Sequence, residues 1–200
     1  MSRRILSLIA LSLLLVQLGW AEHGPKPARG NFVVSDREYS LPDVELRDQD
    51  DRAVDFAALG AGEQRTIISF IFTSCAGICP MITANMARSI PGLDGIDADY
   101  RIVLITVDPE HDTPERLKAY AERFDTGPKI TFLTGTSEQV FQVLRGLDTV
   151  YEGANKMNHQ PVTLISRGPG AGWRRIDGLI GADTVVRQYR ELVEQESEAG

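Results

Sequence analysis

The stretch TIISFIFTSCAGICP, residues 66–80, decides the fold of this chain because it joins a buried strand to a helix that begins at two cysteines. Residues 66–72 are almost wholly apolar and rich in β-branched and aromatic side chains, which is typical of a strand buried on both faces of a sheet. Pro80 suits the first turn of a helix, where the missing N–H costs nothing. We expect this helix to run from Met81 to Ser89 and to end at Pro91 and Gly92.

Strands and helices alternate along the rest of the chain, and polar or glycine-rich turns separate them. Before the first buried strand, residues 44–46 and 53–56 alternate in polarity around a polar turn, which predicts an N-terminal β-hairpin. Further strands are expected at 101–107, 129–133, 161–166 and 173–177, and further helices at 112–124, 137–147 and 182–195. This alternation predicts an α/β sandwich in which a central mixed sheet carries helices on both faces.

Residues 1–21 have the pattern of a secretory signal peptide. Arg3 and Arg4 precede an apolar run, and small residues stand at Gly19 and Ala21, the two positions that a signal peptidase reads. A retained membrane anchor is the alternative, because residues 5–21 carry no charge and approach the roughly 17–25 residues that span a bilayer. In either case we expect an exported protein, periplasmic or periplasm-facing and membrane-anchored. Residues 22–32 read as a linker, and residues 33–200 as one domain.

Composition excludes several functional classes. The chain has 200 residues, 42% of them hydrophobic and 24% charged, which is ordinary for a globular protein. With 21 basic against 28 acidic residues the net charge is -7, so nucleic acid is not an expected partner, since phosphate binding needs a basic face. Two cysteines are too few for a disulfide scaffold or a four-thiolate zinc site.

The two cysteines carry the expected chemistry. Cys75 and Cys79 are four residues apart at a helix start, a spacing that places both sulfurs on one side of a turn. The helix N-terminus favours a thiolate, and Cα atoms about 6 Å apart lie within disulfide range. The pair can therefore be a redox pair or can bind a soft metal ion, of which copper(I) is the leading candidate. An inert structural disulfide is the alternative.

Two motifs resemble those of the SCO/SenC family. FTSCAGICP at residues 72–80 is similar to the cysteine motif of that family, and VDPEHDTPE at residues 107–115 is similar to its second block. The residues at 118–120 and 124, and a late histidine ahead of a strand, also fit. The resemblance extends from Val33 to the end of the chain.

The resemblance implies a thioredoxin-like fold in which two motif cysteines and a distant histidine bind one copper ion. Carried onto this sequence, the ligands are Cys75, Cys79 and His159. Family members are implicated in delivering copper to the dinuclear copper centre of cytochrome c oxidase, in thiol–disulfide exchange on its cysteines, or in both. The implied function is a copper metallochaperone. Its implied partners are a copper-accepting client, such as an oxidase subunit, and a thioredoxin-like reductant.

The position of His159 fits this role, with some departures. In a thioredoxin-like sheet the loop before the penultimate strand faces the cysteine turn, and Pro161 stands where such folds often carry a cis-proline. A loop histidine that merely forms hydrogen bonds is the alternative. The family commonly has proline after the first cysteine and aspartate before the histidine, whereas this chain has Ala76 and Asn158. The second change removes a carboxylate that could support the imidazole.

A second function remains open, that of a thiol–disulfide oxidoreductase that reduces a client's cysteines. His159 would then be dispensable. Peroxide reduction is a third alternative, without a specific supporting residue.

Other residues near the two motifs receive weaker expectations. Asp108 either orients a ligand or is a turn residue, and His111 is expected in a solvated turn. Met157 is a candidate soft ligand, whereas Met81 and Met86 lie on a helix where core packing is the commoner role.

Overall fold

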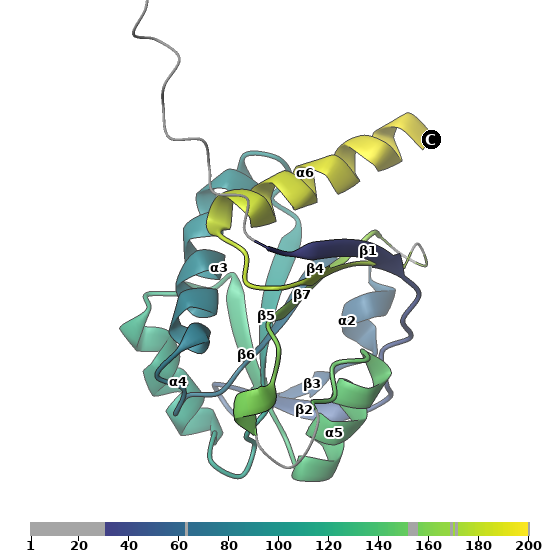
Figure 1. Cartoon of the computed structure of the whole chain (residues 1–200). Helices are drawn as coiled ribbons and strands as arrows, with labels where there is room; N and C mark the ends of the chain where they lie inside the picture. The colour runs from purple at the N-terminus through teal and green to yellow at the C-terminus, as the bar shows by residue number, and fades with distance from the viewer. Residues whose placement is uncertain (1–30, 63, 152–155, 169, 171, 200) are drawn as a thin grey trace, which may run out of the picture.

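A computed structural model describes residues 31–62, 64–151, 156–168, 170 and 172–199 of the chain. The predicted signal peptide or anchor at residues 1–21, and the linker up to residue 30, lie outside the described residues. The described part is built on an eight-stranded sheet with the order β1-β8-β7-β4-β5-β6-β2-β3 (Figure 1). Within the described part of the chain, none of the helices combines the length and the apolar character that crossing a bilayer requires.

The centre of the sheet is the strand predicted from the cysteine motif. β4 (Arg65–Ile71) pairs in parallel with β5 (Tyr100–Thr106), and β5 pairs in parallel with β6 (Ile130–Thr134). On its other side, β4 pairs antiparallel with β7 (Val162–Ser166), so the sheet is mixed as expected. Every residue of β4 after Arg65 is buried, because helices pack on both faces of the sheet at this strand.

The outer strands complete the sheet. The predicted hairpin is present as β2 (Glu45–Asp48) and β3 (Ala53–Asp55), and β2 joins the sheet against β6. β8 (Trp173–Asp177) pairs with β7. One strand was not expected from the sequence, namely β1 (Val33–Arg37), which pairs antiparallel with β8. Its side chains are mostly exposed and show no alternation in burial, so the pairing with β8 and the contact of Asp36 with Arg174 are what hold it.

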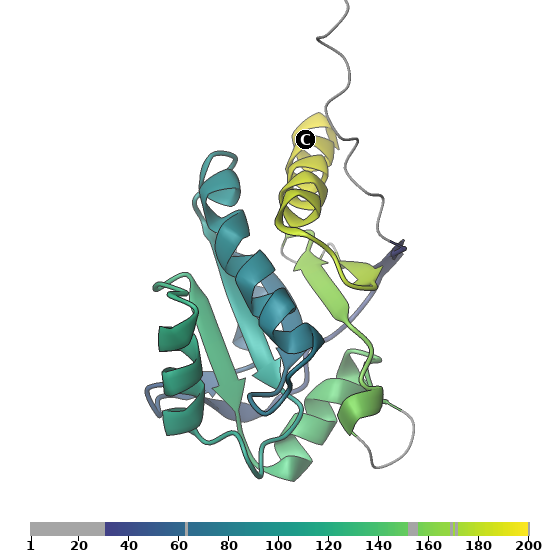
Figure 2. The ribbon, with the colours of Figure 1, turned by 60° about the vertical axis from the view of Figure 1, so that its left-hand side comes forward.

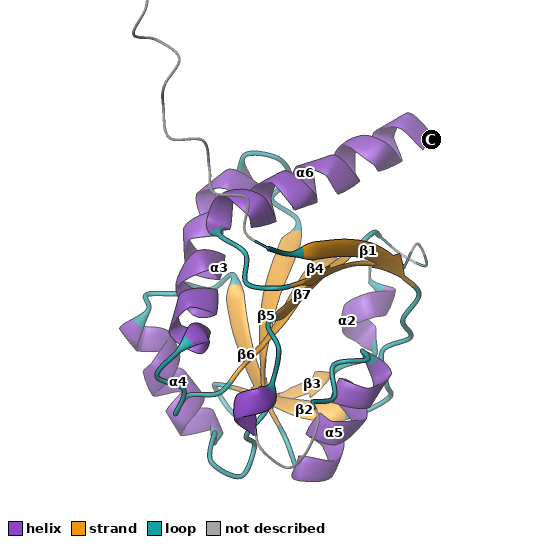
Figure 3. Cartoon of the chain, viewed as in Figure 1, coloured by secondary structure: helices purple, strands orange, loops and turns teal. Residues whose placement is uncertain are grey.

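Helices cover both faces of the sheet, as predicted. Figure 1 shows α3, α4 and α6 on one side and α2 and α5 on the other, and Figure 3 shows the same division by secondary structure. The bounds are α2 (Ala58–Ala61), α3 (Ile78–Asp94), α4 (Pro114–Arg123), α5 (Ser137–Gly146) and α6 (Ala182–Ala199), with a 3-10 turn η2 (Lys156–Asn158) before β7. Figure 2 shows α3 and α6 along the same side of the sheet.

The prediction that Pro91 and Gly92 end the helix was wrong, because α3 continues through both residues to Asp94. Tertiary packing overrides the local signal. Leu93 is completely buried, and a Cβ atom on Gly92 would lie only 2.7 Å from a methyl carbon of Val186 on α6. Gly92 thus lets α6 approach closely, and the contact between the two helices offsets the backbone hydrogen bond that Pro91 cannot make.

Candidate metal and thiol site

The cysteine turn follows directly after β4 and leads into α3. Cys75 lies in the turn, where its N–H donates a hydrogen bond to the carbonyl of Phe72 at 3.2 Å. Cys79 is the second residue of α3, so α3 begins earlier than the sequence predicted and includes this cysteine in its first turn. Both side chains are buried, with 7% of Cys75 and none of Cys79 exposed, and both are free thiols. The alternative of a structural disulfide is therefore not the state that the structure describes.

The two thiols have different acidities. Burial raises the pKa of Cys75, but hydrogen bonds from the Cys79 thiol and from the N–H groups of Cys79, Gly77 and Ile78 together outweigh it, and the pKa ends below its ordinary value. Burial raises the pKa of Cys79 to about 12, and its hydrogen bond to Cys75 acts in the same direction. Cys75 is therefore the readier thiolate and nucleophile, and Cys79 holds its proton.

The second motif, residues 107–115, forms hydrogen bonds to the segment that leads into the cysteine turn. Asp112 is completely buried and accepts hydrogen bonds from the N–H of Thr73 at 3.0 Å and from the hydroxyl of Thr106 at 2.6 Å. The hydroxyl of Thr73 donates to the other oxygen of the same carboxylate. The cap of α4 is Thr113, whose side chain accepts from the N–H of Arg116, so Asp112 is free to turn inward. The sequence placed Asp112 only at a helix start and missed this role.

His159 lies between η2 and β7 and is buried, with 5% of its surface exposed. Burial lowers the pKa of its imidazole to about 4, so the ring is neutral at physiological pH. The rings of Phe70 and Tyr151 contact it edge-on, with centroids 5.9 Å and 6.5 Å away. Its Nε2 atom is buried and has no hydrogen-bond partner within the described part of the chain, which is uncommon for a buried polar atom.

The structure brings Cys75 and Cys79 together. Across residues 31–199, excepting the undescribed positions, it forms no group of three or more histidine, cysteine, aspartate or glutamate side chains that could hold a metal ion. His159 is therefore not part of a completed ligand set with the two thiols. The donor types nevertheless fit copper, since two thiols and a neutral imidazole with an unused nitrogen suit this ion.

The expected cis-proline at position 161 was wrong. Across the described residues no peptide bond is cis, so the bond before Pro161 is trans. The carbonyl of Pro161 accepts a hydrogen bond from the N–H of Gly178 at 2.8 Å, which continues the pairing of β7 with β8. Extended chain entering a sheet in this way has no need of the less favourable cis isomer.

The residues with weaker expectations have mixed outcomes. His111 is exposed and contacts Arg116, as expected for a solvated turn. Met86 is buried in the core, whereas Met81, which was expected to pack there as well, is 50% exposed because it lies on the outer side of the first turn of α3. Met157 is 63% exposed.

Asp108 has a partner that the sequence did not suggest. Its carboxylate forms an ion pair with the ammonium group of Lys156. Nothing in the spacing of the two residues signals this contact, because Asp108 follows β5, Lys156 begins η2, and the two are 48 positions apart.

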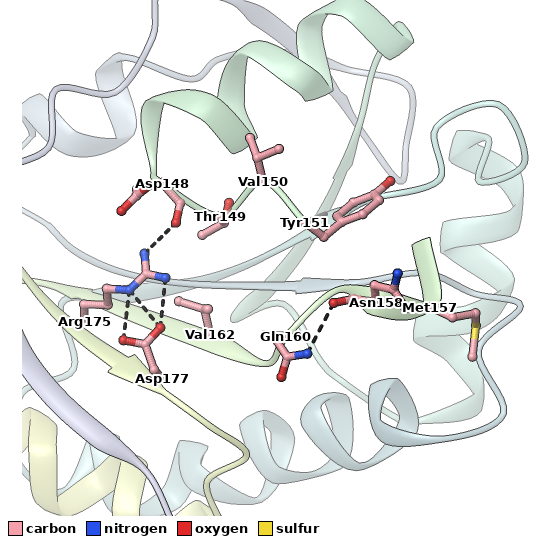
Figure 4. Close-up of a pocket in the computed structure, with 10 residues that line it drawn as sticks. All are labelled: Asp148, Thr149, Val150, Tyr151, Met157, Asn158, Gln160, Val162, Arg175 and Asp177. Atoms are coloured by element: carbon pink, nitrogen blue, oxygen red, sulfur yellow. Dashed lines mark hydrogen bonds and ion pairs between the residues drawn. The ribbon is translucent and has the colours of Figure 1, made fainter. Parts of the chain in front are cut away.

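A cavity of about 580 Å³ lies beside η2 (Figure 4). Met157, Asn158 and Gln160 line it on one side, and the loop of residues 148–151 after α5 lines it on another. On β8, the guanidinium of Arg175 is already engaged by the carboxylate of Asp177 at 2.9 Å and by main-chain carbonyls of the α5 loop. The turn η2, which directly precedes His159, therefore borders this cavity.

A family model described as SCO1/SenC matches residues 35–194 of this chain. A protein of Stutzerimonas stutzeri, named as a candidate copper-binding protein, is 30% identical over 191 residues, which cover 88% of this chain and 91% of that protein.

Two solved structures share the fold. One is Arabidopsis thaliana ScoI with copper bound, with a TM-score of 0.64 and 24% identity, over 78% of this chain and 99% of that one. The other is BsSco, a member of the Sco family of cytochrome c oxidase assembly proteins, with a TM-score of 0.66 and 24% identity, over 80% and 96% of the two chains. These likenesses confirm the expected thioredoxin-like sandwich.

Proposed function

This chain belongs to the SCO1/SenC family, and from that premise we propose that it is an exported copper metallochaperone. It would bind one copper ion as cargo through Cys75, Cys79 and His159 and pass it to a copper-accepting client, such as a subunit of cytochrome c oxidase. The observation that carries the proposal is the unused, buried Nε2 atom of His159, found in a chain whose two thiols are also free.

The protonation states suit this task. His159 is already neutral at physiological pH, so its nitrogen can bind a metal without first losing a proton. Cys75 gives up its proton readily, whereas Cys79 keeps its own until a metal ion displaces it. Copper binding would therefore release thiol protons, and a fall in pH would favour release of the ion.

Copper stoichiometry tests the proposal. The reduced full-length protein should bind one equivalent of copper(I), and the variants Cys75→Ser and His159→Ala should bind it more weakly. The exposed His111 offers a matched control, and His111→Ala should bind as the wild type does. Wild-type affinity in both Cys75→Ser and His159→Ala would contradict the proposal.

The unequal thiols favour a second candidate function, thiol–disulfide exchange with a client. The Cys75 thiolate would attack a client disulfide, forming a mixed disulfide and releasing one client sulfur as a thiolate. Cys79 would then lose its proton and attack the sulfur of Cys75, which releases the second client sulfur. The client gains two electrons, the chain ends with a Cys75–Cys79 disulfide, and a thioredoxin-like reductant would restore the dithiol.

A redox titration distinguishes the two functions. For an exchange role, the pair should equilibrate with a client disulfide at a moderate potential, and His159→Ala should leave the rate unchanged. A very negative potential without exchange would contradict this second role.

A further inference from the structure

Lys156 connects the turn that carries His159 to the carboxyl ends of two central strands. Its ammonium group pairs with Asp108, just beyond β5, and lies 5.4 Å from the ring centroid of Phe72, just beyond β4. The pair is partly buried, with side-chain exposures of 37% for Lys156 and 14% for Asp108. The cation and its methylene stem therefore lie over the edge of the sheet from which the cysteine turn leaves.

A continuous set of hydrogen bonds leads from this ion pair to the cysteine turn. The N–H of Asp108 donates to the hydroxyl of Thr106 at 2.9 Å, and that hydroxyl donates to Asp112 at 2.6 Å. Asp112 also accepts the N–H of Thr73, two residues before Cys75, at 3.0 Å. The turn before His159 and the turn before Cys75 are thus joined through the ion pair of Lys156 with Asp108 and through the buried carboxylate of Asp112.

The main chain of Lys156 makes a second connection. Its carbonyl accepts a hydrogen bond from the N–H of His159 at 3.2 Å, so the backbone of the histidine is attached to the residue whose side chain docks on the sheet. We propose that Lys156 is a positioning residue of the copper site, which sets where His159 presents its imidazole relative to the two thiols. This inference rests on the proposed function, since it concerns the same three ligands.

The chain contains a matched ion pair with which Lys156 can be compared. Lys118 pairs with Asp50 at 2.9 Å, and the two side chains are 55% and 31% exposed. A pair of this kind contributes little, because water screens it and the ordering of both side chains offsets the attraction. Lys118→Met is therefore the control for Lys156→Met, since each variant replaces a cation by an apolar side chain of similar length.

The first experiment uses the metal-free, full-length protein. Amide hydrogen exchange at His159 and the imidazole resonances of that residue are measured by NMR in the wild type, Lys156→Met, Lys156→Arg and Lys118→Met. We expect exchange at His159 to become several-fold faster and its ring resonances to move in Lys156→Met, with Lys156→Arg close to the wild type and Lys118→Met unchanged. Unchanged exchange and resonances in Lys156→Met would overturn the proposal.

The second experiment measures copper(I) affinity in a double-mutant cycle of Lys156→Met with His159→Ala. Loss of an outer contact to a metal ligand commonly weakens metal binding about 10-fold to 100-fold, and we expect a loss at the lower end for Lys156→Met alone. The same substitution should have no further effect in the His159→Ala background. An equal loss in both backgrounds would mean that Lys156 acts through its charge and not through His159, which overturns the inference.

The two proposals fail in different ways. A wild-type protein that does not bind copper contradicts the proposed function. The metal-free exchange measurement decides separately whether Lys156 positions His159.

Discussion

The carboxylate of Asp112 accepts a hydrogen bond from the main-chain N–H of Thr73 at 3.0 Å, and this contact joins the two sequence blocks that first identified the family. The spacing of the second block thus has a structural reason. Its aspartate turns away from the helix that follows and secures the segment leading into Cys75. Chemistry at the cysteines and the stability of the second block are therefore linked through one side chain.

Replacing Asp112 by alanine should destabilise the fold strongly. The substitution leaves the partly buried N–H of Thr73 and the buried hydroxyl of Thr106 without their acceptor, at a cost of up to about 1–3 kcal/mol for each group in the free energy of unfolding. Urea denaturation measures this loss. Asp50→Ala, which removes an exposed ion pair, is the control and should cost much less. Equal stabilities for the two variants would refute the assigned role of Asp112.

The two cysteines should react with an alkylating agent at different rates. In the wild-type protein, Cys75 should be alkylated at neutral pH at least about tenfold faster than Cys79, because the pKa of Cys75 is lowered and that of Cys79 is raised to about 12. The pH dependence of alkylation by iodoacetamide measures both thiols. Equal rates, or a faster Cys79, would contradict the description of the turn.

Buried His159 should make the protein less stable in acid. Its pKa is about 4 in the folded protein and ordinarily about 6.5, so between these values the unfolded chain binds more protons than the folded one. The free energy of unfolding should therefore fall as the pH drops from about 6.5 to about 4, by about 3 kcal/mol from this residue. Denaturation at several pH values should show a shallower fall in His159→Gln. If His159→Gln followed the wild-type pH profile, the imidazole would not be buried as described.

Gly92 should tolerate no side chain while α6 keeps its position. Gly92→Ala would bring a Cβ to 2.7 Å from Val186, and such overpacking typically costs about 1–3 kcal/mol in the free energy of unfolding. Val186→Ala should relieve part of this cost in the double variant. Gly95→Ala is the matched control, because the nearest atom to its Cβ lies at 3.5 Å. Similar stabilities of Gly92→Ala and Gly95→Ala would argue against the close approach of the two helices.

The sequence predicts most of the central sheet because burial leaves a local record. The apolar run before the cysteines predicts β4, and the capping residues Thr113 and Pro114 predict the start of α4. What the sequence does not predict depends on contacts between distant segments. β1 lacks any alternation of its own and exists through β8, and α3 passes Pro91 because α6 packs on it.

The candidate site shows the same division. Cys75 and Cys79 could be identified from their spacing and from the strand before them, and His159 from a resemblance. The hydrogen bonds of Asp112 and the ion pair of Lys156 could not, because no local pattern records which loops meet at the edge of a sheet. The residues that hold a site in place are in this case harder to foresee than the residues that would carry out its chemistry.

The two cysteines differ in exposure, and this difference sets the order in which another protein can reach them. Since 7% of Cys75 and none of Cys79 is exposed, a molecule that approaches this turn meets Cys75 before Cys79. A partner that binds at this turn would then contact Cys75 first and Cys79 second, and would leave Cys79 before Cys75.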